Sequence, residues 1–389
     1  MTTRSGGTVL VVNAGSSSVK YELVDVDTGE HTARGVVGSL GETGGTLRHG
    51  FPDADAVRRP VGVVSHAGAV GLMFDCFAAE GPSLEGVVGV GHRVVHGGAS
   101  FTGPVLVDDD VVREIGQLVP LAPLHNQVAL DCIAAVAARL PDTPQVAVFD
   151  TAFHTTVPEA ATAFALPRDV IEPHGLRRFG FHGTSVEYVV GRAAAVLGKE
   201  PSATGLIVCH LGNGASVTAV RDGRSVDTSM GFSPLGGLVM GTRSGDVDAS
   251  AVLYLLDQLG MSPSGVEDLL NHGSGLQGLT GDSDMRRVRA RAEMGEPQAL
   301  RALAICAHRI RTYIGAALAQ VPRLDAVVFT GGIGENDARL RDEVCTPLAH
   351  LAIPRILVVP TDEEHQIALH TIELVNPPKD RHHVDHPAT

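Results

Sequence analysis

The sequence predicts an α/β protein of two domains. Its 389 residues and 44% hydrophobic content are enough for two hydrophobic cores, at about 100–200 residues per domain. Short β-rich apolar runs alternate with stretches of helical periodicity, which is typical of the α/β class. A strand–turn–strand pattern with glycine at the turn occurs near residues 8–25 and again near residues 206–220. We interpret this echo as a sign of two related halves.

The first half of the chain opens with a predicted pair of strands. Residues 8–12 form a β-rich apolar run, residues 13–18 form a turn of glycine and serine, and residues 19–25 alternate between apolar and polar side chains. The other elements expected here are two buried strands and an intervening helix, at 89–95, 145–149 and 127–140. Residues 28–85 are glycine-rich and weakly patterned, and they predict no definite element.

The second half repeats that pattern and adds longer helices. Residues 206–220 predict two strands around a turn at 212–216. Helical spacing predicts helices at 246–259 and 297–321, and capping boxes predict helix starts at 184–187 and 264–267. A strand at 325–330 runs into the glycine cluster 331–336 and then into a helix. Such a junction presents backbone N–H groups to an anion or a nucleotide.

Charge and cysteine content restrict the partners and the compartment. The net charge is −14, and only three of the 30 basic residues are lysines, so nucleic acid and anionic membranes are not expected partners. The longest uncharged stretch, 202–220, contains polar side chains and predicts no membrane span. Seven residues precede the first strand, which is too short for a signal peptide, and the five scattered cysteines predict reduced thiols. We therefore expect a cytoplasmic protein.

The chain is rich in glycine, with 46 residues, or roughly 12% against a typical ~7%. Glycine clusters at strand ends allow backbone donors to approach a phosphate closely. Two common nucleotide signatures are nevertheless missing. The only Gly-Lys pair, Gly198-Lys199, is followed by Glu200, so there is no P-loop, and the Gly-x-Gly pairs lack the third glycine of a dinucleotide fingerprint. An NAD-dependent dehydrogenase is thereby disfavoured.

Charged side chains stand beside the glycine clusters. Arg93 and Arg243 lie within glycine-containing segments, Asp150 ends a predicted buried strand, and His182 precedes a predicted helix. Taken singly, each has an ordinary structural reading, as a salt bridge, a capping residue or a buried histidine. Their repeated association with glycine clusters favours a phosphate-handling site.

Two segments, VVNAGSSSVK at 11–20 and VCHLGNGASV at 208–217, resemble the signature segments of the acetate kinase family. Blocks similar to others of that family follow in the same order: GHRVVHGG, PLAPLHN, FDTAFH, RFGFHGTS, GTRSGDVD, FTGGIGEN and TDEE. The resemblance implies a homodimeric enzyme, dependent on Mg²⁺ with Mn²⁺ as an alternative, that reversibly transfers a phosphoryl group from ATP to acetate. The products are acetyl phosphate and ADP, the first step from acetate to acetyl-CoA.

The resemblance also implies a fold of two RNase H-like domains, a duplicated βββαβαβα arrangement around a central nucleotide-binding cleft. The expected N-terminal domain comprises residues 1–150 together with about 363–389, because the last helix returns to it. The expected C-terminal domain comprises residues 151–362. The final stretch, 376–389, has three prolines and three histidines and is expected to be a mobile tail.

The resemblance assigns the site residues position by position. The catalytic set is Arg93, His125, Asp150, His182 and Arg243. The acetate-binding set is Arg93, Val95, Leu124, Phe181 and Pro234. The ATP-binding set is Lys20, His210, Leu211, Gly212, Asn213, Gly214, Asp284, Met285, Arg286, Gly332, Ile333, Gly334, Glu335 and Asn336. The metal-binding set is Asn13 and Glu363.

Acetate is already ionised at pH 7, so the reaction needs no strong general base, and Asp150 is expected to act by electrostatics and positioning. We expect direct in-line transfer, with an acyl-phosphate on an enzyme carboxylate as the rival mechanism. Propionate or butyrate kinase is the nearest alternative activity, since one methylene in an apolar pocket changes discrimination by only ~1–3 kcal/mol. A non-catalytic ATP-binding module is disfavoured because Arg93, Asp150, His182 and Arg243 are all present.

Overall fold

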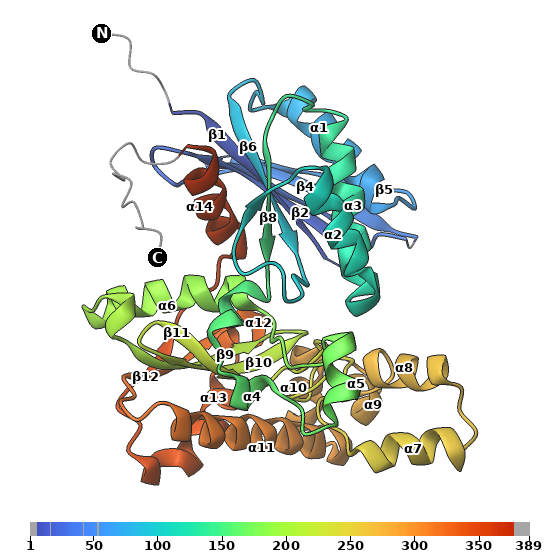
Figure 1. Ribbon diagram of the computed structural model, residues 1–389, viewed down its shortest axis with the longest axis vertical. Coiled ribbons are helices and arrows are strands. Elements are labelled where there is room, and N and C mark those ends of the chain that lie inside the picture. Colours follow the sequence, from blue (N-terminus) through green and yellow to red (C-terminus); the bar gives the residue numbers. More distant parts are fainter. Residues whose placement is uncertain (1–5, 16, 42, 53, 377–389) are drawn as a thin grey trace. The chain divides into compact units, whose positions relative to one another are not determined.

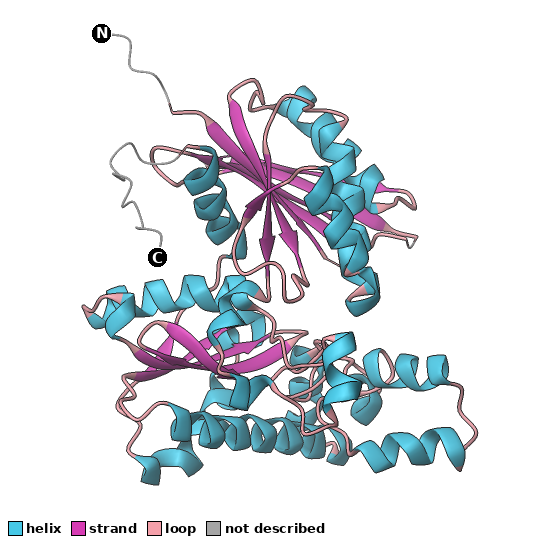
Figure 2. Cartoon of the chain, in the orientation of Figure 1, coloured by secondary structure: helices cyan, strands magenta, loops and turns pink. Residues whose placement is uncertain are grey.

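The computed structural model describes residues 6–15, 17–41, 43–52 and 54–376, apart from the side chain of Leu124. It has two β-sheets with helices packed on them (Figure 2). The chain divides into two compact units. Unit 1 is built from the described residues of Met1–Gly97, Gly103–Phe149 and Glu363–Thr389, and unit 2 from Gly98–Thr102 and Asp150–Asp362. Of the tail expected to be mobile, all but Asn376 lies outside the described residues.

Unit 1 contains an eight-stranded sheet in the order β5-β4-β3-β2-β1-β6-β8-β7. Its strands are β1 (Thr8–Ala14), β2 (Ser18–Asp25), β3 (His31–Gly38), β4 (Gly45–Phe51), β5 (Ala54–Val61), β6 (Val87–Val94), β7 (Val105–Leu106) and β8 (Gln145–Phe149). Its helices are α1 (His66–Glu80), α2 (Asp109–Gln117), α3 (Pro123–Ala137) and α14 (Glu363–Val375), with the 3₁₀ helix η1 (Val119–Leu121). Strands β1 to β5 form an antiparallel series, whereas β6 is parallel to both β1 and β8.

The two faces of this sheet pack against different helices, as Figure 1 shows. Along β1, Leu10 and Val12 point to the core formed with α1 and α3, while Val9 and Val11 point to the core formed with α14. This alternation follows from the two-residue period of a strand. Helix α14 lies so close to β6 that a Cβ at Gly91 would come within 2.3 Å of the Thr371 hydroxyl oxygen. Glycine at this position therefore lets α14 pack on the sheet.

The weakly patterned segment 28–85 contains three further strands, β3 to β5, and helix α1. Its apolar alternation is interrupted because some inward positions are glycines. A Cβ at Gly35 would lie 2.2 Å from the phenol oxygen of Tyr21, whose hydroxyl bonds the buried His49 over 2.8 Å. Part of the glycine excess is thus explained by the room that Tyr21 needs beneath β3.

Unit 2 contains a five-stranded sheet in the order β11-β10-β9-β12-β13. Its strands are β9 (Gly205–Leu211), β10 (Ala215–Arg221), β11 (Arg224–Thr228), β12 (Ala326–Thr330) and β13 (Ile356–Val358). Its α-helices are α4 (Glu159–Thr162), α5 (Arg168–Ile171), α6 (Gly183–Leu197), α7 (Ala249–Asp257), α8 (Pro263–Asn271), α9 (Gly275–Thr280), α10 (Met285–Glu293), α11 (Pro297–Gln320), α12 (Gly331–Asn336) and α13 (Ala338–Cys345). Its 3₁₀ helices are η2 (Ala152–Thr156), η3 (Glu172–His174), η4 (Pro201–Ala203) and η5 (Thr346–Leu351).

The two sheets share one topology, which confirms the predicted duplication. In unit 1 the order β3-β2-β1-β6-β8 has three antiparallel strands followed by two parallel additions, and β11-β10-β9-β12-β13 repeats it. Helix α6 follows β8 in the chain but packs on the unit 2 sheet, where Val186 and Val189 share a core with Leu206. Helix α14 follows β13 but packs on the unit 1 sheet. Each sheet is therefore completed by a helix that follows the other sheet in sequence.

Several helix boundaries differ from the sequence expectations. Helix α8 is capped by Ser262, whose hydroxyl oxygen accepts from the Gly265 N–H, so the box expected at 264–267 is wrong. Helix α6 begins after His182, and Thr184 lies inside its first turn, so the box expected at 184–187 is also wrong. Pro263 occupies the first helical turn of α8, where its missing N–H costs nothing, and this places the start earlier.

Candidate functional site

The first group of site residues lies in unit 1, at the carboxyl ends of β1 and β6 and the first turn of α14. Because β1 and β6 are parallel, their ends meet at one edge of the sheet. The Arg93 guanidinium donates from Nη1 to Asn13 Oδ1 over 3.3 Å, and Arg93 Nε lies 3.8 Å from Glu363 Oε2. Asn13 Nδ2 donates to Glu364 Oε1 over 2.8 Å and to Glu363 Oε2 over 3.4 Å. Residues 350 positions apart in sequence thus form one polar cluster.

Glu364 belongs to this cluster and was not among the residues expected from the sequence. Besides Asn13 it contacts Lys20, whose Nζ lies 3.7 Å from Glu364 Oε1. Its side chain is only 13% exposed, whereas that of Lys20 is 57% exposed. The signal that could have found it is its place as the second glutamate of the TDEE motif, in the first turn of α14, where carboxylates are favoured.

The oxygen atoms of this cluster suit a magnesium ion that is also bound by the phosphate groups of a substrate. Within the described residues no group of three or more His, Cys, Asp or Glu could enclose a metal ion. Mg²⁺ commonly takes one or two protein oxygens and completes its shell with water and phosphate. The Glu363 carboxylate and the Asn13 amide oxygen are ligands of that kind, and the amide lies beside the carboxylate, to which its nitrogen donates over 3.4 Å.

The other residues expected in the unit 1 part of the site are Val95, Leu124 and His125, which follow β6 or lie in the first turn of α3. Val95 follows β6 directly and is buried. His125 is half-buried in the first turn of α3, and the side chain of Leu124 lies outside the described residues. The backbone of His96 is fixed by the buried Asn126, which accepts from the His96 N–H over 3.1 Å and donates to its carbonyl over 2.9 Å. The loop after β6 and the start of α3 are therefore tied together.

The second group of residues lies in unit 2, around the start of α6. Asp150 is 1% exposed, and its carboxylate accepts from the Thr184 hydroxyl over 3.2 Å. Its backbone carbonyl accepts from the Gly183 N–H over 2.8 Å, and a Cβ at Gly183 would lie 2.2 Å from that oxygen. His182 precedes Gly183 and adopts the left-handed region, with φ 61°. The tight turn that holds Asp150 therefore also fixes the backbone of His182, at a conformational cost that non-glycine residues rarely bear.

His182 and Arg243 converge on the glycine turn between β9 and β10. His182 Nδ1 is bonded to Ser216 Oγ over 3.0 Å, which directs Nε2 toward Gly214. A Cβ at Gly214 would lie 3.1 Å from His182 Nε2 and 3.6 Å from Arg243 Nη1. The His182 imidazole and the Arg243 guanidinium thus both lie within 4 Å of one point beside the Gly214 backbone. The His210 ring stacks on His182, with centroids 4.2 Å apart.

The segment that carries Arg243 contains no helix or strand, yet it is extensively anchored. Arg243 Nη1 donates to the Pro234 carbonyl over 3.2 Å and lies 3.9 Å from Met240 Sδ. Pro234, expected in the acetate pocket, therefore contacts Arg243 directly through its backbone. Phe181, expected in the same pocket, is buried, and its carbonyl accepts from His154 Nε2 over 2.9 Å.

Unit 2 also contains a cavity of about 990 Å³, of a size that suits a nucleotide. Eight residues expected to contact ATP line it: Gly212, Asn213, Asp284, Met285, Arg286, Gly332, Ile333 and Asn336. The sequence analysis missed four other lining residues: Ser283, Arg287, Arg289 and Asp337. The other unit 2 residues expected to bind ATP, His210, Leu211, Gly214, Gly334 and Glu335, do not line the cavity. Lys20 lies in unit 1.

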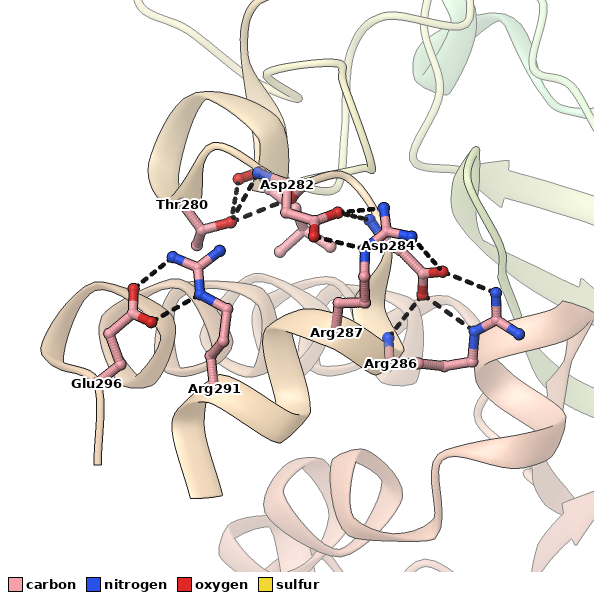
Figure 3. Close-up of polar contacts among 8 residues, drawn as sticks. Thr280, Asp282, Asp284, Arg286, Arg287, Arg291 and Glu296 are labelled. Atoms are coloured by element: carbon pink, nitrogen blue, oxygen red, sulfur yellow. Dashed lines mark hydrogen bonds and ion pairs between the residues drawn. The ribbon is translucent and has the colours of Figure 1, made fainter. Parts of the chain in front are cut away.

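Ion pairs hold the arginines at the rim of this cavity, as Figure 3 shows. Arg287 pairs with both oxygens of Asp282, and Arg286 pairs with both oxygens of Asp284. The Arg287 guanidinium lowers the pKa of Asp282 to about 2, and hydrogen bonds from Arg286 lower the pKa of Asp284 to about 2. Because Asp284 also caps α10 through the Arg286 N–H, its pairing orients the first turn of that helix.

Glu335 braces the loop rather than facing the cavity. Its Oε1 accepts from the Gly331 N–H over 2.9 Å and from the Thr361 N–H over 3.1 Å. The glycine cluster that was expected to precede a helix is itself the short helix α12. Glycine is required at Gly331, where φ is 78° and a Cβ would lie 2.8 Å from the Leu211 carbonyl. The nucleotide-side glycines thus also pack α12 on β9.

Comparisons with known proteins show which proteins this chain resembles over nearly its whole length. A sequence model of the Acetokinase family matches residues 8–365. The acetate kinase of Streptomyces avermitilis is 48% identical over 394 residues, covering 94% of this chain and 97% of that protein. The crystal structure of Porphyromonas gingivalis acetate kinase superposes with a TM-score of 0.87 at 38% identity, covering 95% of this chain and 100% of that one. A propionate kinase from Francisella tularensis gives a TM-score of 0.89 at 38% identity, covering 94% and 99%.

Both the family match and the relatives extend over nearly the whole chain. The chain belongs to the acetokinase family.

Proposed function

We propose that the protein is an acetate kinase, which transfers the γ-phosphoryl group of ATP to acetate and gives acetyl phosphate and ADP. The observation that carries the proposal is the convergence of His182 and Arg243 on Gly214, in a chain 48% identical to an acetate kinase over nearly its full length. Phosphoryl transfer needs little covalent chemistry from a protein and depends on positioning and on positive charge near the transferring group.

His182 and Arg243 supply that charge in unit 2. The planar guanidinium of Arg243 can bind two phosphoryl or carboxylate oxygens at once, which a lysine ammonium cannot do with the same geometry. The hydrogen bond from Arg243 Nη1 to the Pro234 carbonyl orients the guanidinium. Ser216 holds His182 by Nδ1, so that Nε2 is the nitrogen presented to the substrate.

Asp150 holds its place without acting as a base. Its carboxylate is occupied by the Thr184 hydroxyl, and acetate needs no deprotonation at pH 7. In-line attack by the acetate oxygen on the γ-phosphorus is therefore the mechanism we propose. Inversion of configuration at a chiral phosphorus would support it, whereas retention would indicate an acyl-phosphate on an enzyme carboxylate.

Arg93, Asn13 and Glu363 have the corresponding roles in unit 1. We propose that Arg93 binds the acetate carboxylate and that Asn13 and Glu363 hold Mg²⁺, or Mn²⁺ in its place. When bound, the metal ion neutralises charge on the phosphate oxygens. The contacts between Arg93, Asn13 and Glu363 bring these three side chains together without any bound substrate.

Acetate is proposed over propionate as the preferred substrate, because the more identical relatives are acetate kinases. The similarity to a propionate kinase structure makes propionate the specific rival. ATP plus acetate with hydroxylamine should give Mg²⁺-dependent acetyl hydroxamate, and kcat/KM should fall from acetate to propionate to butyrate. No product above background would refute the proposed function, and a higher kcat/KM for propionate would replace acetate by propionate.

We also propose that the protein is a homodimer formed through α7. No residue of this helix is buried, and the large apolar side chains of Leu253 and Tyr254 are each 57% exposed. A helix rich in apolar side chains needs a covering surface, and Val247 and Leu259 at its two ends extend the exposed patch. A second copy of the chain is the simplest cover. Light scattering should show a dimer for the wild type and for Val112→Asp on α2, and a monomer for Leu253→Asp. A monomeric wild type would contradict the proposal.

We further propose that units 1 and 2 are the two RNase H-like domains of this kinase, bounded near residues 150 and 363, and that the enzyme is cytoplasmic. The boundaries at which the chain divides into its units support the first proposal. No helix within the described part of the chain is long and apolar enough to span a bilayer. Acetate and ATP are the partners we propose, with neither nucleic acid nor membrane.

A further inference from the structure

Three polar side chains are hydrogen-bonded in series: Thr361, between β13 and α14, Ser185 in α6, and His210 in β9, just before the Gly212 turn. Thr361 Oγ1 lies 2.6 Å from Ser185 Oγ, and Ser185 Oγ lies 2.8 Å from His210 Nδ1. Ser185 is completely buried and His210 is 9% exposed. Contacts of this length between buried polar atoms are hydrogen bonds and not incidental packing.

The backbone at Thr361 is held by Glu335 of α12. The Thr361 N–H donates to Glu335, which also accepts from the Gly331 N–H. Ser185 lies in the first turn of α6, directly after the turn that fixes Asp150 and His182. Both hydroxyl groups are therefore attached to segments whose positions are already fixed.

The hydroxyl protons of Thr361 and Ser185 favour one direction of donation along these hydrogen bonds. The Ser185 hydroxyl has one proton and two neighbours, so it donates to one and accepts from the other. Within the described residues the Thr361 hydroxyl has no hydrogen-bond partner other than Ser185. The direction Thr361 to Ser185 to His210 therefore gives both hydroxyl protons an acceptor among the described residues, whereas the reverse direction leaves only solvent to accept the proton of the half-buried Thr361.

The direction also determines what the far side of the imidazole can do. If Nδ1 accepts from Ser185, the ring proton is on Nε2. His210 Nε2 lies 3.8 Å from the position that a Cβ on Gly212 would take, so it faces the glycine turn whose residues line the 990 Å³ cavity. A neutral His210 also avoids placing a second positive charge against the stacked ring of His182.

We propose that Ser185 and Thr361 are positioning residues that fix His210 in the tautomer with its proton on Nε2. In this state His210 presents a hydrogen-bond donor toward the nucleotide phosphates at the Gly212 turn. This inference rests on the proposed function only for the identity of the ligand. The tautomer itself is a property of the protein without substrate.

The tautomer is measured by long-range ¹H–¹⁵N correlation spectra of protein labelled with ¹⁵N-histidine, in which the protonated and unprotonated ring nitrogens have distinct shifts. His210→Gln identifies the His210 signals. We expect the wild type to be protonated at Nε2. Ser185→Ala should give a mixture of tautomers, because Nδ1 loses its donor. Thr361→Val should also admit the tautomer with its proton on Nδ1, because the Ser185 oxygen no longer accepts from Thr361 and can accept from Nδ1–H instead.

Activity gives the second readout. Ser185→Ala should lower kcat/KM for ATP by about tenfold, the factor expected when one hydrogen bond to a charged group is weakened. The KM for acetate should change little. Ser202→Ala, which removes an exposed serine of η4, is the matched control and should change neither the spectrum nor the kinetics. Ser185→Thr keeps a hydroxyl and should retain the Nε2 tautomer if Ser185→Ala fails to fold.

Protonation of wild-type His210 at Nδ1 would overturn the inference, as would an unchanged spectrum in Ser185→Ala. A wild type with the expected tautomer but without acetyl hydroxamate production would refute the proposed function and still support the assigned direction of the hydrogen bonds.

Discussion

Asn13 donates a hydrogen bond to Glu364 over 2.8 Å, so the residue at the end of β1 is held by the first turn of a helix about 350 residues later in the chain. The neighbouring Glu363 is the residue expected to bind the metal ion. Glu364 therefore fixes the Asn13 amide from the side opposite to Arg93, which donates to Asn13 Oδ1.

Removing this acceptor should weaken metal-dependent activity. We expect Glu364→Ala to raise the Mg²⁺ concentration for half-maximal activity several-fold, because the Asn13 amide then loses its shortest hydrogen bond and keeps only the longer ones with Glu363 and Arg93. Glu364→Gln keeps an acceptor and should have a smaller effect. Glu373→Gln, on the exposed face of the same helix, is the control. An unchanged Mg²⁺ dependence in Glu364→Ala would show that Asn13 is positioned by other contacts.

Gly214→Ala should impair turnover without destabilising the fold. The new Cβ would lie 3.1 Å from His182 Nε2, a contact that forces one of the two groups to move by a few tenths of an ångström. We expect kcat to fall by about tenfold, since geometry errors of this order are costly in phosphoryl transfer. Gly191→Ala on α6, where a Cβ meets nothing within 4 Å, is the matched control. Unchanged kcat in Gly214→Ala would place the reacting group elsewhere.

Arg93→Ala and Arg243→Ala should each lower kcat by ~10²–10³, the range measured when one donor to a developing oxyanion is removed. The steady-state rate of acetyl hydroxamate formation measures both. Arg113→Ala is a suitable control, because Arg113 is 65% exposed and pairs only locally with Asp110 among the described residues. Near-normal kcat in either variant would remove that arginine from the proposed mechanism.

Tyr313→Phe tests the support of the Arg243 segment by α11. The Tyr313 hydroxyl donates to Asp246 Oδ2, and Asp246 Oδ1 accepts from the Gly237 N–H over 2.7 Å. Burial and the adjacent carboxylate raise the pKa of Tyr313 above its usual range, so the hydroxyl remains a donor. We expect kcat to fall about fivefold with an unchanged KM for ATP, and no further fall in an Arg243→Ala background. Thr312→Val, the next residue on the helix, should behave as wild type.

Two buried histidines should make the fold sensitive to mild acid. Desolvation lowers the pKa of His92 and that of His154 to about 4, although hydrogen bonds to Gln145 and to the Phe181 carbonyl partly oppose it. The unfolded chain takes up these protons near pH 6.5, so the stability they contribute is complete above that pH and is lost as the pH falls toward 4. Each histidine should cost on the order of 2 kcal/mol at pH 5.

Urea unfolding at pH 7.5, 6 and 5 measures this loss. His154→Gln should reduce the slope of the unfolding free energy against pH between 6.5 and 4. His272→Gln, on an exposed histidine, should leave that slope unchanged. A wild-type unfolding free energy that does not vary between pH 7.5 and 5 would contradict the prediction.

Local sequence patterns predicted the central strands and one long helix. The runs at 8–12, 206–211 and 326–330 lie in strands whose consecutive apolar residues bury both faces, and 297–320 is a helix with one apolar side. Residues 28–85 were not predicted, because glycines such as Gly35 replace the apolar residues that a strand pattern requires. The capping boxes were wrong because Ser262 and the left-handed His182 begin their helices instead.

The sequence by itself determined the α/β class and the duplicated halves, and it supplied Arg93, Asp150, His182 and Arg243 as candidate site residues, because these depend on local periodicity and on motifs read in order. Only the tertiary structure decided that α6 completes the sheet of the other half, that Glu364 holds Asn13, and that Ser185 connects Thr361 to His210. These contacts join residues that are distant in sequence, and their positions follow from strand order and helix packing, which no local pattern encodes.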